Sequence, residues 1–127
     1  AIQKKSDLEK HAFIGYIEDQ VFSDLLKYQH EISPDLQLIY KSTTIHTQRK
    51  AVRAGLGVGV LPHFVAYGDP DLSPVLPDFL LHRELWISTS KDLHQFKDLK
   101  RTWDFILSAC AEEKYRFIEW ATMYQSV

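Results

Sequence analysis

The amino-acid sequence predicts an α/β fold with at least some parallel strands. Short apolar runs rich in β-favouring residues, at residues 12–16 and 36–41, alternate with stretches of helical character. A glycine-rich joint at residues 51–62 then separates a helical stretch from another apolar run. Such alternation is typical of sheets whose strands are connected through helices, and these connections make neighbouring strands parallel.

The first third of the chain is expected to contain two strands with a helix between them. Ser23 is placed to cap a helix at residues 24–30, because a serine hydroxyl there accepts a hydrogen bond from the first turn. Pro34 ends this helix, and the strand at residues 36–41 follows. Ahead of the first strand, Ser6 has the position of an N-cap for a short helical turn.

The middle of the chain is expected to continue with a helix at residues 42–54 and a strand at residues 58–61. A short helix at residues 62–67 begins with proline, which suits a first helical position. A turn at residues 68–71 and an extended piece follow. Residues 84–89 are predicted to form a further strand.

From Asp92 onward the apolar residues recur at helical spacing, which predicts a long amphipathic helix. The stripe consists of Leu93, Phe96, Trp103, Ile106, Leu107 and Cys110, and its continuation would be Phe117, Ile118 and Ala121. Core packing is the plain interpretation of the stripe, and Cys110 is expected to be a small buried hydrophobe on it. A stripe left open would instead be an association surface, which predicts a homo-oligomer.

Composition limits the function further. The chain has 127 residues, 45% of them hydrophobic and 25% charged, with a net charge of −2, which suits one domain or part of one. No strongly basic face is implied, so the chain alone is expected to make no direct nucleic-acid contact. No apolar run approaches the roughly 18 residues that span a bilayer, and a cytoplasmic protein is expected. The single cysteine excludes an internal disulfide.

The three glycines of the joint raise the possibility of a phosphate-binding loop. A dinucleotide fingerprint needs a strand before its glycines and a helix after them, whereas here a helical stretch precedes Gly55 and a strand follows Gly57. A P-loop would also need Lys and Ser or Thr where Leu61 and Pro62 stand. We therefore expect Gly55 to end a helix in a left-handed conformation, and Gly57 and Gly59 to let a strand approach its neighbour closely.

The joint at residues 51–62 resembles the AVxAGxGxxxLP segment of LysR-type transcriptional regulators. Three further stretches resemble the same family in matching order and spacing: residues 7–16, residues 71–77, and residues 84–89 with 103–106. The resemblance extends over roughly residues 7–110 and lies in the effector-binding domain of the family. Residues 111–127 match no stretch of it.

The resemblance implies a type 2 periplasmic-binding-protein-like fold of two lobes. Residues 1–80 would be most of the second lobe, and residues 81–127 the crossover strand and C-terminal helix of an incomplete first lobe. The winged helix-turn-helix of the family is absent from this sequence, although the full-length protein is expected to bind DNA. The chain would be an expressed fragment, a truncated gene product, or a chain that completes itself by pairing.

The candidate ligand site lies where the strand at residues 36–41 meets the following helix. Thr43 and Thr44 would offer hydroxyls and free backbone N–H groups to a carboxylate, although plain N-capping is the alternative. The resemblance favours binding, because effectors of the family contact this strand end. Tyr16 would lie beside the same edge, or be an ordinary packed aromatic. His46 would donate to the effector, or be an exposed side chain.

These features predict an effector-binding domain that senses a small anionic metabolite. The alternatives are a small α/β enzyme, which lacks any nucleophile or cofactor motif, and a lobe of a solute-binding protein, for which no secretion signal is seen. The six histidines lack the spacing of a metal site, so neither metal nor cofactor is expected, and no membrane contact is expected.

Overall fold

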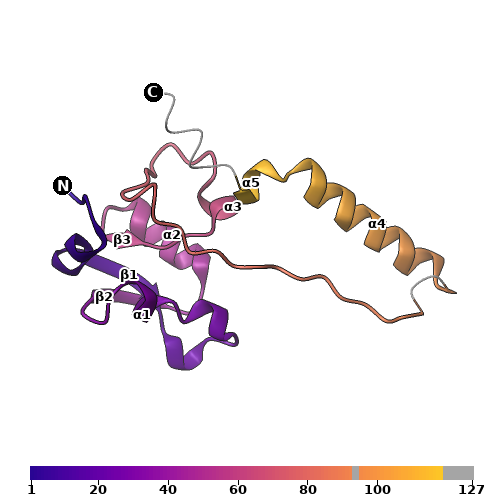
Figure 1. Cartoon of the computed structure of the whole chain (residues 1–127), viewed down its shortest axis with the longest axis horizontal. Coiled ribbons are helices and arrows are strands. Elements are labelled where there is room, and N and C mark those ends of the chain that lie inside the picture. The colour runs from indigo at the N-terminus through magenta and orange to yellow at the C-terminus, as the bar shows by residue number, and fades with distance from the viewer. Residues whose placement is uncertain (93–94, 119–127) are drawn as a thin grey trace. The chain divides into compact units, whose positions relative to one another are not determined.

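The computed structural model describes residues 1–92 and 95–118 (Figure 1). The chain forms two compact units, Ala1–Leu81 and His82–Val127. They are called unit 1 and unit 2.

Unit 1 is built on a small parallel sheet with the strand order β2-β1-β3 (Figure 1). The strands are β1 (Ala12–Tyr16), β2 (Gln37–Ser42) and β3 (Val58–Gly59), and β1 pairs in parallel with both neighbours. The α/β class with parallel pairing is therefore confirmed. The third strand is shorter than the predicted one, since only two of its residues form the ladder.

Two helices of unit 1, the first and the second, connect these strands, and a third follows β3. They are α1 (Gln29–Ile32), α2 (Ile45–Arg53) and α3 (His63–Ala66). The helix expected at residues 24–30 is in fact two short pieces, a 3-10 turn at Asp24–Leu26 and then α1. The Ser23 hydroxyl caps the first piece as predicted, because it accepts the N–H of Leu25.

The N-terminal turn differs from the prediction in its cap. A 3-10 helix spans Lys5–Lys10, so Ser6 lies inside the turn and does not precede it. The carboxylate of Asp7 takes the capping role and accepts the backbone N–H groups of Gln3 (2.9 Å) and Lys4 (3.1 Å). A carboxylate is the stronger acceptor, which explains why it takes these two N–H groups.

Strand β1 is covered on both faces. A Cβ placed on Gly15 would meet the side chain of Gln29 at 3.1 Å, which puts the α1 segment on one face. A Cβ on Gly59 would lie 3.6 Å from the Cβ of Ile14 and 3.0 Å from Val52 of α2. Because successive strand residues point to opposite faces, α1 and α2 lie on opposite sides of the sheet. This is the arrangement of doubly wound α/β folds.

The hydrophobic core of unit 1 gathers around β1. Phe13 and Ile14 are almost completely buried, at 1% and 0% exposure. One buried cluster consists of Leu8, Phe13, Tyr16, Tyr28 and Ile32. Burying each large apolar side chain contributes about 1.5–3 kcal/mol, so these residues supply much of the stability of the unit.

The glycine joint has the predicted direction, with a helix entering it and a strand leaving it. Gly55 has φ 75°, its N–H donates to the carbonyl of Val52, and the N–H of Leu56 donates to the carbonyl of Ala51. These two bonds form a Schellman motif, which satisfies the last carbonyls of α2. The glycines lead into strand β3 and not directly into a helix whose first turn could face a phosphate, so the joint is not a phosphate loop.

Gly57 lets β3 approach β1 closely. A Cβ at this position would collide with the backbone carbonyl of Ala12, the first residue of β1. The prediction of a close backbone approach is therefore confirmed.

An ionic cluster joins α2 to the turn after α3. The carboxylate of Asp69 accepts two bonds from Arg49 (3.0 and 2.6 Å) and lies 3.3 Å from Arg53, which also pairs with Asp71. The Asp69 side chain is only 2% exposed. Burial raises the pKa of this carboxyl, but the N–H of Asp71 and the two guanidinium groups outweigh it and hold the pKa below its ordinary value.

Unit 2 has less regular structure than predicted. Its described elements are α4 (Lys97–Glu112) and α5 (Tyr115–Ile118). The strand predicted at residues 84–89 is wrong, because these residues form no ladder (Figure 1). Leu85 and Trp86 are 72% and 85% exposed. Alternating residues alone cannot make a strand, because a strand needs a neighbour to receive its backbone hydrogen bonds.

The long helix of unit 2 was predicted correctly, but its burial was not. None of the described residues from 82 to 117 is buried, and Cys110 is exposed, so its expected place in a core is wrong. Trp103 is partly covered, whereas Phe105 is 71% exposed. The helix stops at Glu112 and a separate turn carries Phe117. Leu93 and Ala121 of the predicted stripe lie outside the described residues.

The close approach at Gly57 generates a stability prediction. Gly57→Ala should lower the free energy of unfolding by about 2–3 kcal/mol, because the new methyl group forces β3 away from β1. Gly55→Ala is the matched control, since its methyl group would meet open space and only the positive φ costs about 1 kcal/mol. Urea unfolding measures both, and equal losses in the two variants would contradict the close approach.

The Asp69 cluster predicts a dependence of stability on pH. Because the folded-state pKa of Asp69 is lowered, its contribution is fully present above the unfolded pKa of about 3.9 and is lost as pH falls through the folded pKa. Asp69→Asn should therefore destabilise the protein at neutral pH and flatten the acid limb of the unfolding curve. The exposed Asp35→Asn is the control. An unchanged acid limb in Asp69→Asn would refute this role.

Candidate functional site

The candidate site is the edge of the sheet where β1 and β2 end. Tyr16 and Ser42 are cross-strand partners at the carboxyl ends of the two parallel strands. The N–H of Ile17, just past β1, donates to the carbonyl of Ser42 (3.3 Å). Ligands of doubly wound folds bind outside the carboxyl ends of strands, so this edge is the place that the topology favours.

Helix α2 begins directly at this edge. The Ser42 hydroxyl accepts the N–H of Thr44 (3.1 Å), while the Thr44 hydroxyl shares a hydrogen bond with that of Thr47 (2.6 Å). The hydroxyl of Thr44 therefore makes no capping bond, and capping by Thr44 was wrong. In this described part of the chain, no acceptor is found for the N–H groups of Ile45, His46 and Thr47.

The electrostatics of α2 suit an anion at its first turn. The partial positive charge of the helix dipole is concentrated there, and no acidic side chain of the helix offsets it. Lys50 and Arg53 lie in the last turn, where cations stabilise the opposite end. Three N–H groups without acceptors at such an end can hold a carboxylate or a similar oxyanion.

The structure brings three of the four predicted residues to the same short stretch. Thr43, Thr44 and His46 surround the start of α2, and all three are exposed. The exposure of His46 is compatible with both roles expected of it. Whether any of them contacts an effector stays a prediction.

Tyr16 lies across the strand pair from Ser42 and is well packed. Its ring meets the ring of Tyr28 edge to face at 6.0 Å, and it is only 6% exposed. Burial raises the pKa of the Tyr16 phenol, so the hydroxyl stays protonated across the physiological range. Tyr16 is thus a packed aromatic at the edge of the site.

Two buried glutamines at this edge were not predicted. The carboxamide of Gln29 donates to the carbonyl of Tyr16 (3.0 Å), and that of Gln48 donates to the carbonyl of Ser42 (3.2 Å). They are 7% and 1% exposed, and neither carboxamide oxygen has a hydrogen-bond partner among the residues that the structure describes. The sequence signal was weak: Gln48 lies three residues before Ala51 on the buried face of α2, where a polar residue needs a reason.

The described residues were compared with the requirements of a metal site and of a membrane-spanning helix. No three His, Cys, Asp or Glu side chains among them lie close enough together to hold a metal ion. No helix in that part of the chain is both long and apolar enough to cross a bilayer.

Comparison with known proteins gives the family. The family model of the LysR substrate binding domain matches residues 2–111, which covers most of the chain and agrees with the resemblance seen in the sequence. No curated protein and no solved structure matches the chain. The chain therefore belongs to the LysR substrate binding domain family, the effector-binding domains of LysR-type transcriptional regulators.

Proposed function

We propose that this chain binds a small anionic metabolite and transmits its presence to a DNA-binding domain outside these 127 residues. The family match over residues 2–111 carries the proposal, because this domain is the ligand-binding part of such regulators. A ligand acts in this way when it binds two arrangements of the protein with different affinities. Because a transcription regulator acts on DNA, we expect the protein in the cytoplasm.

The start of α2 is the proposed effector site. Its support is the set of three N–H groups without acceptors at Ile45, His46 and Thr47, beside the carboxyl end of β2. We assign Thr43 and Thr44 as effector contacts through their backbone and hydroxyl groups, and His46 as a side-chain donor. Tyr16 forms the neighbouring wall of the site.

In the two-lobed fold of the family, residues 1–80 would be most of the second lobe. The support is the doubly wound arrangement of unit 1, with its parallel strands and helices on both faces. Residues 81–127 would contribute a strand and the final helix to the first lobe.

The anion site predicts a localised spectroscopic response. Titration with sodium acetate should shift the amide resonances of Ile45, His46 and Thr47 in ¹H–¹⁵N spectra far more than sodium chloride of equal ionic strength does. Thr44→Ala should weaken acetate binding by about 2- to 10-fold, the equivalent of one hydrogen bond. Thr102→Ala, which changes an exposed threonine of α4, is the control and should bind normally.

Two outcomes would overturn this assignment. Acetate shifts that are spread evenly over the chain would mean that no site exists at α2. Acetate affinity that falls equally in Thr44→Ala and Thr102→Ala would mean that the hydroxyl of Thr44 is not a contact.

We also propose that the chain associates with a second copy through unit 2. The apolar side chains of this unit are unusually open: Leu85, Trp86 and Phe105 are each more than 70% exposed. Exposed apolar side chains gathered in one unit are typical of an association surface.

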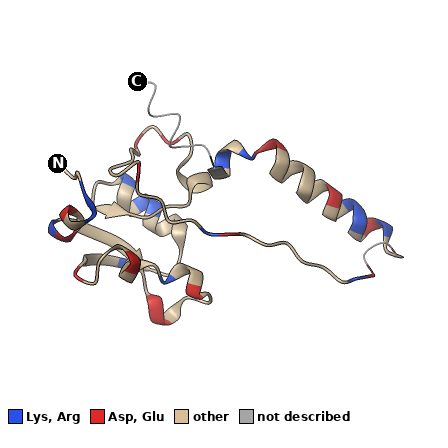
Figure 2. Cartoon of the chain, viewed as in Figure 1, with Lys and Arg blue, Asp and Glu red and all other residues tan. Residues whose placement is uncertain are grey.

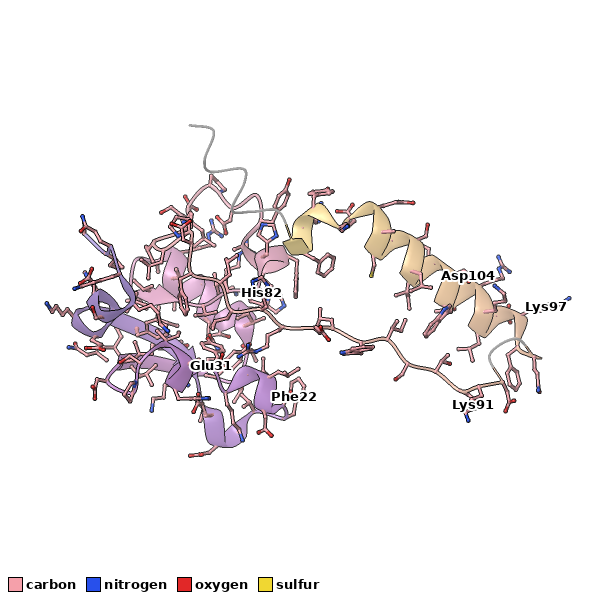
Figure 3. The ribbon with its side chains drawn as sticks, viewed as in Figure 1. Phe22, Glu31, His82, Lys91, Lys97 and Asp104 are labelled. Atoms are coloured by element: carbon pink, nitrogen blue, oxygen red, sulfur yellow. The ribbon has the colours of Figure 1, made fainter. Side chains whose placement is uncertain are left out.

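Charges of both signs lie along α4 beside these apolar side chains (Figures 2 and 3). Its first turns carry Lys97, Lys100 and Arg101 together with Asp98, and Lys100 pairs with Asp104 (2.6 Å). Exposed apolar side chains bordered by charged ones are typical of a surface that another protein chain covers.

Sedimentation equilibrium tests the association. The chain should be dimeric at high micromolar concentration, and the double variant Trp86→Ser, Phe105→Ser should raise the dimer dissociation constant at least 10-fold, because each side chain contributes about 1.5–3 kcal/mol when buried. Phe22→Ser is the control, since Phe22 is 96% exposed on unit 1 (Figure 3) and should leave the dimer intact. A monomeric wild-type chain at that concentration would refute the proposal.

A further inference from the structure

Ser42 is the node that joins β1, β2 and α2. Its carbonyl receives two donors, the N–H of Ile17 from the end of β1 and the carboxamide of Gln48 from α2. Its hydroxyl receives the N–H of Thr44, the residue before α2. The position of the first turn of α2 relative to the sheet therefore depends on how the backbone of Ser42 is held.

Gln48 is an unusual choice for this contact. It is among the largest fully buried side chains of the protein, and its carboxamide oxygen has no hydrogen-bond partner. A buried acceptor without a partner costs about 1–3 kcal/mol, whereas the bond to Ser42 returns only about 0.5–1.5 kcal/mol. An apolar residue of the same size would serve stability at least as well, because the carbonyl of Ser42 keeps Ile17 as a donor.

The carboxamide oxygen of Gln48 is shielded, so a ligand cannot reach it directly. We propose that Gln48 is a positioning residue of the effector site: its carboxamide holds the carbonyl of Ser42 and so fixes the strand end on which Thr43, Thr44 and the first turn of α2 depend. The inference rests on the proposed function, because it assigns Gln48 a role in that same site.

The geometry supports this role from two directions. Gln48 lies on the buried face of α2 one turn after Thr44, whose carbonyl accepts the Gln48 N–H (3.3 Å), so one residue bonds both to the start of its own helix and to the strand before it. Gln29 makes the equivalent bond to Tyr16 from the opposite face of the sheet. The two adjacent strand ends are thus each held by a buried carboxamide.

Gln48→Met tests the inference, since methionine has a similar size and lacks the donor. In the ligand-free chain the N–H groups of Thr44 and Ile17 should exchange with solvent at least 5-fold faster, and acetate affinity measured at the α2 amides should fall at least 5-fold. The urea unfolding midpoint should stay the same or rise, because the acceptor without a partner is removed. Gln37→Met, at the exposed start of β2, is the matched control and should change none of these.

Gln48→Asn provides a second variant, because its shorter side chain keeps the amide but cannot reach Ser42, and it should loosen the same N–H groups. Unchanged exchange at Thr44 and Ile17 in both variants would overturn the positioning role, whatever happens with acetate. A fall in affinity that only matches a fall in stability would also overturn it, since Gln48 would then be merely structural. If the proposed function itself is wrong, the result is a different one: the amide resonances of α2 in the wild-type chain would not shift when acetate is added.

Discussion

The close approach of β3 to β1 is the constraint on which the rest of unit 1 depends. No side chain fits between Gly57 and the carbonyl of Ala12, so only a glycine allows the strand to pair there. Once β3 pairs on that side, β1 becomes the central strand and its Phe13 and Ile14 are buried on both faces. The order β2-β1-β3 then places α1 and α2 on opposite faces, with the carboxyl ends of β1 and β2 side by side at one edge of the sheet.

The polar groups at this edge are organised at a cost in stability. The buried atoms without partners include the Tyr28 hydroxyl and the carboxamide oxygens of Gln29 and Gln48, and all three residues pack against or bond to the ends of β1 and β2. A unit with a core this small would be more stable if these positions were apolar. Polar groups that weaken a fold and lie at one edge of its sheet are typical of functional sites, where stability is lower than it could be.

Much of unit 1 could be predicted from the sequence, because its signals are local. The Schellman end at Gly55 and the cap at Ser23 depend on a few neighbouring residues, and both formed as expected. The start of α2 was predicted at residue 42, three residues too early, because Ser42 is the last residue of β2 and α2 begins at Ile45. The bonds around this start were not predicted either, since the partner of the Thr44 hydroxyl is Thr47. Gln29 and Gln48 could not be found, because a buried carboxamide is recognised only when the strand end that it holds is known.

In unit 2 the local sequence patterns do not predict which side chains are buried. Residues 84–89 have the alternation of a strand and α4 has the stripe of a core helix, yet neither is covered in the described structure. Pattern specifies which face of an element must be buried, and only a partner surface can bury it. If that surface belongs to a second copy or to another part of a regulator, assembly supplies the missing core. A ligand at α2 that binds two arrangements of the assembly with different free energies would then shift the balance between them. The effect of the ligand would therefore extend beyond unit 1.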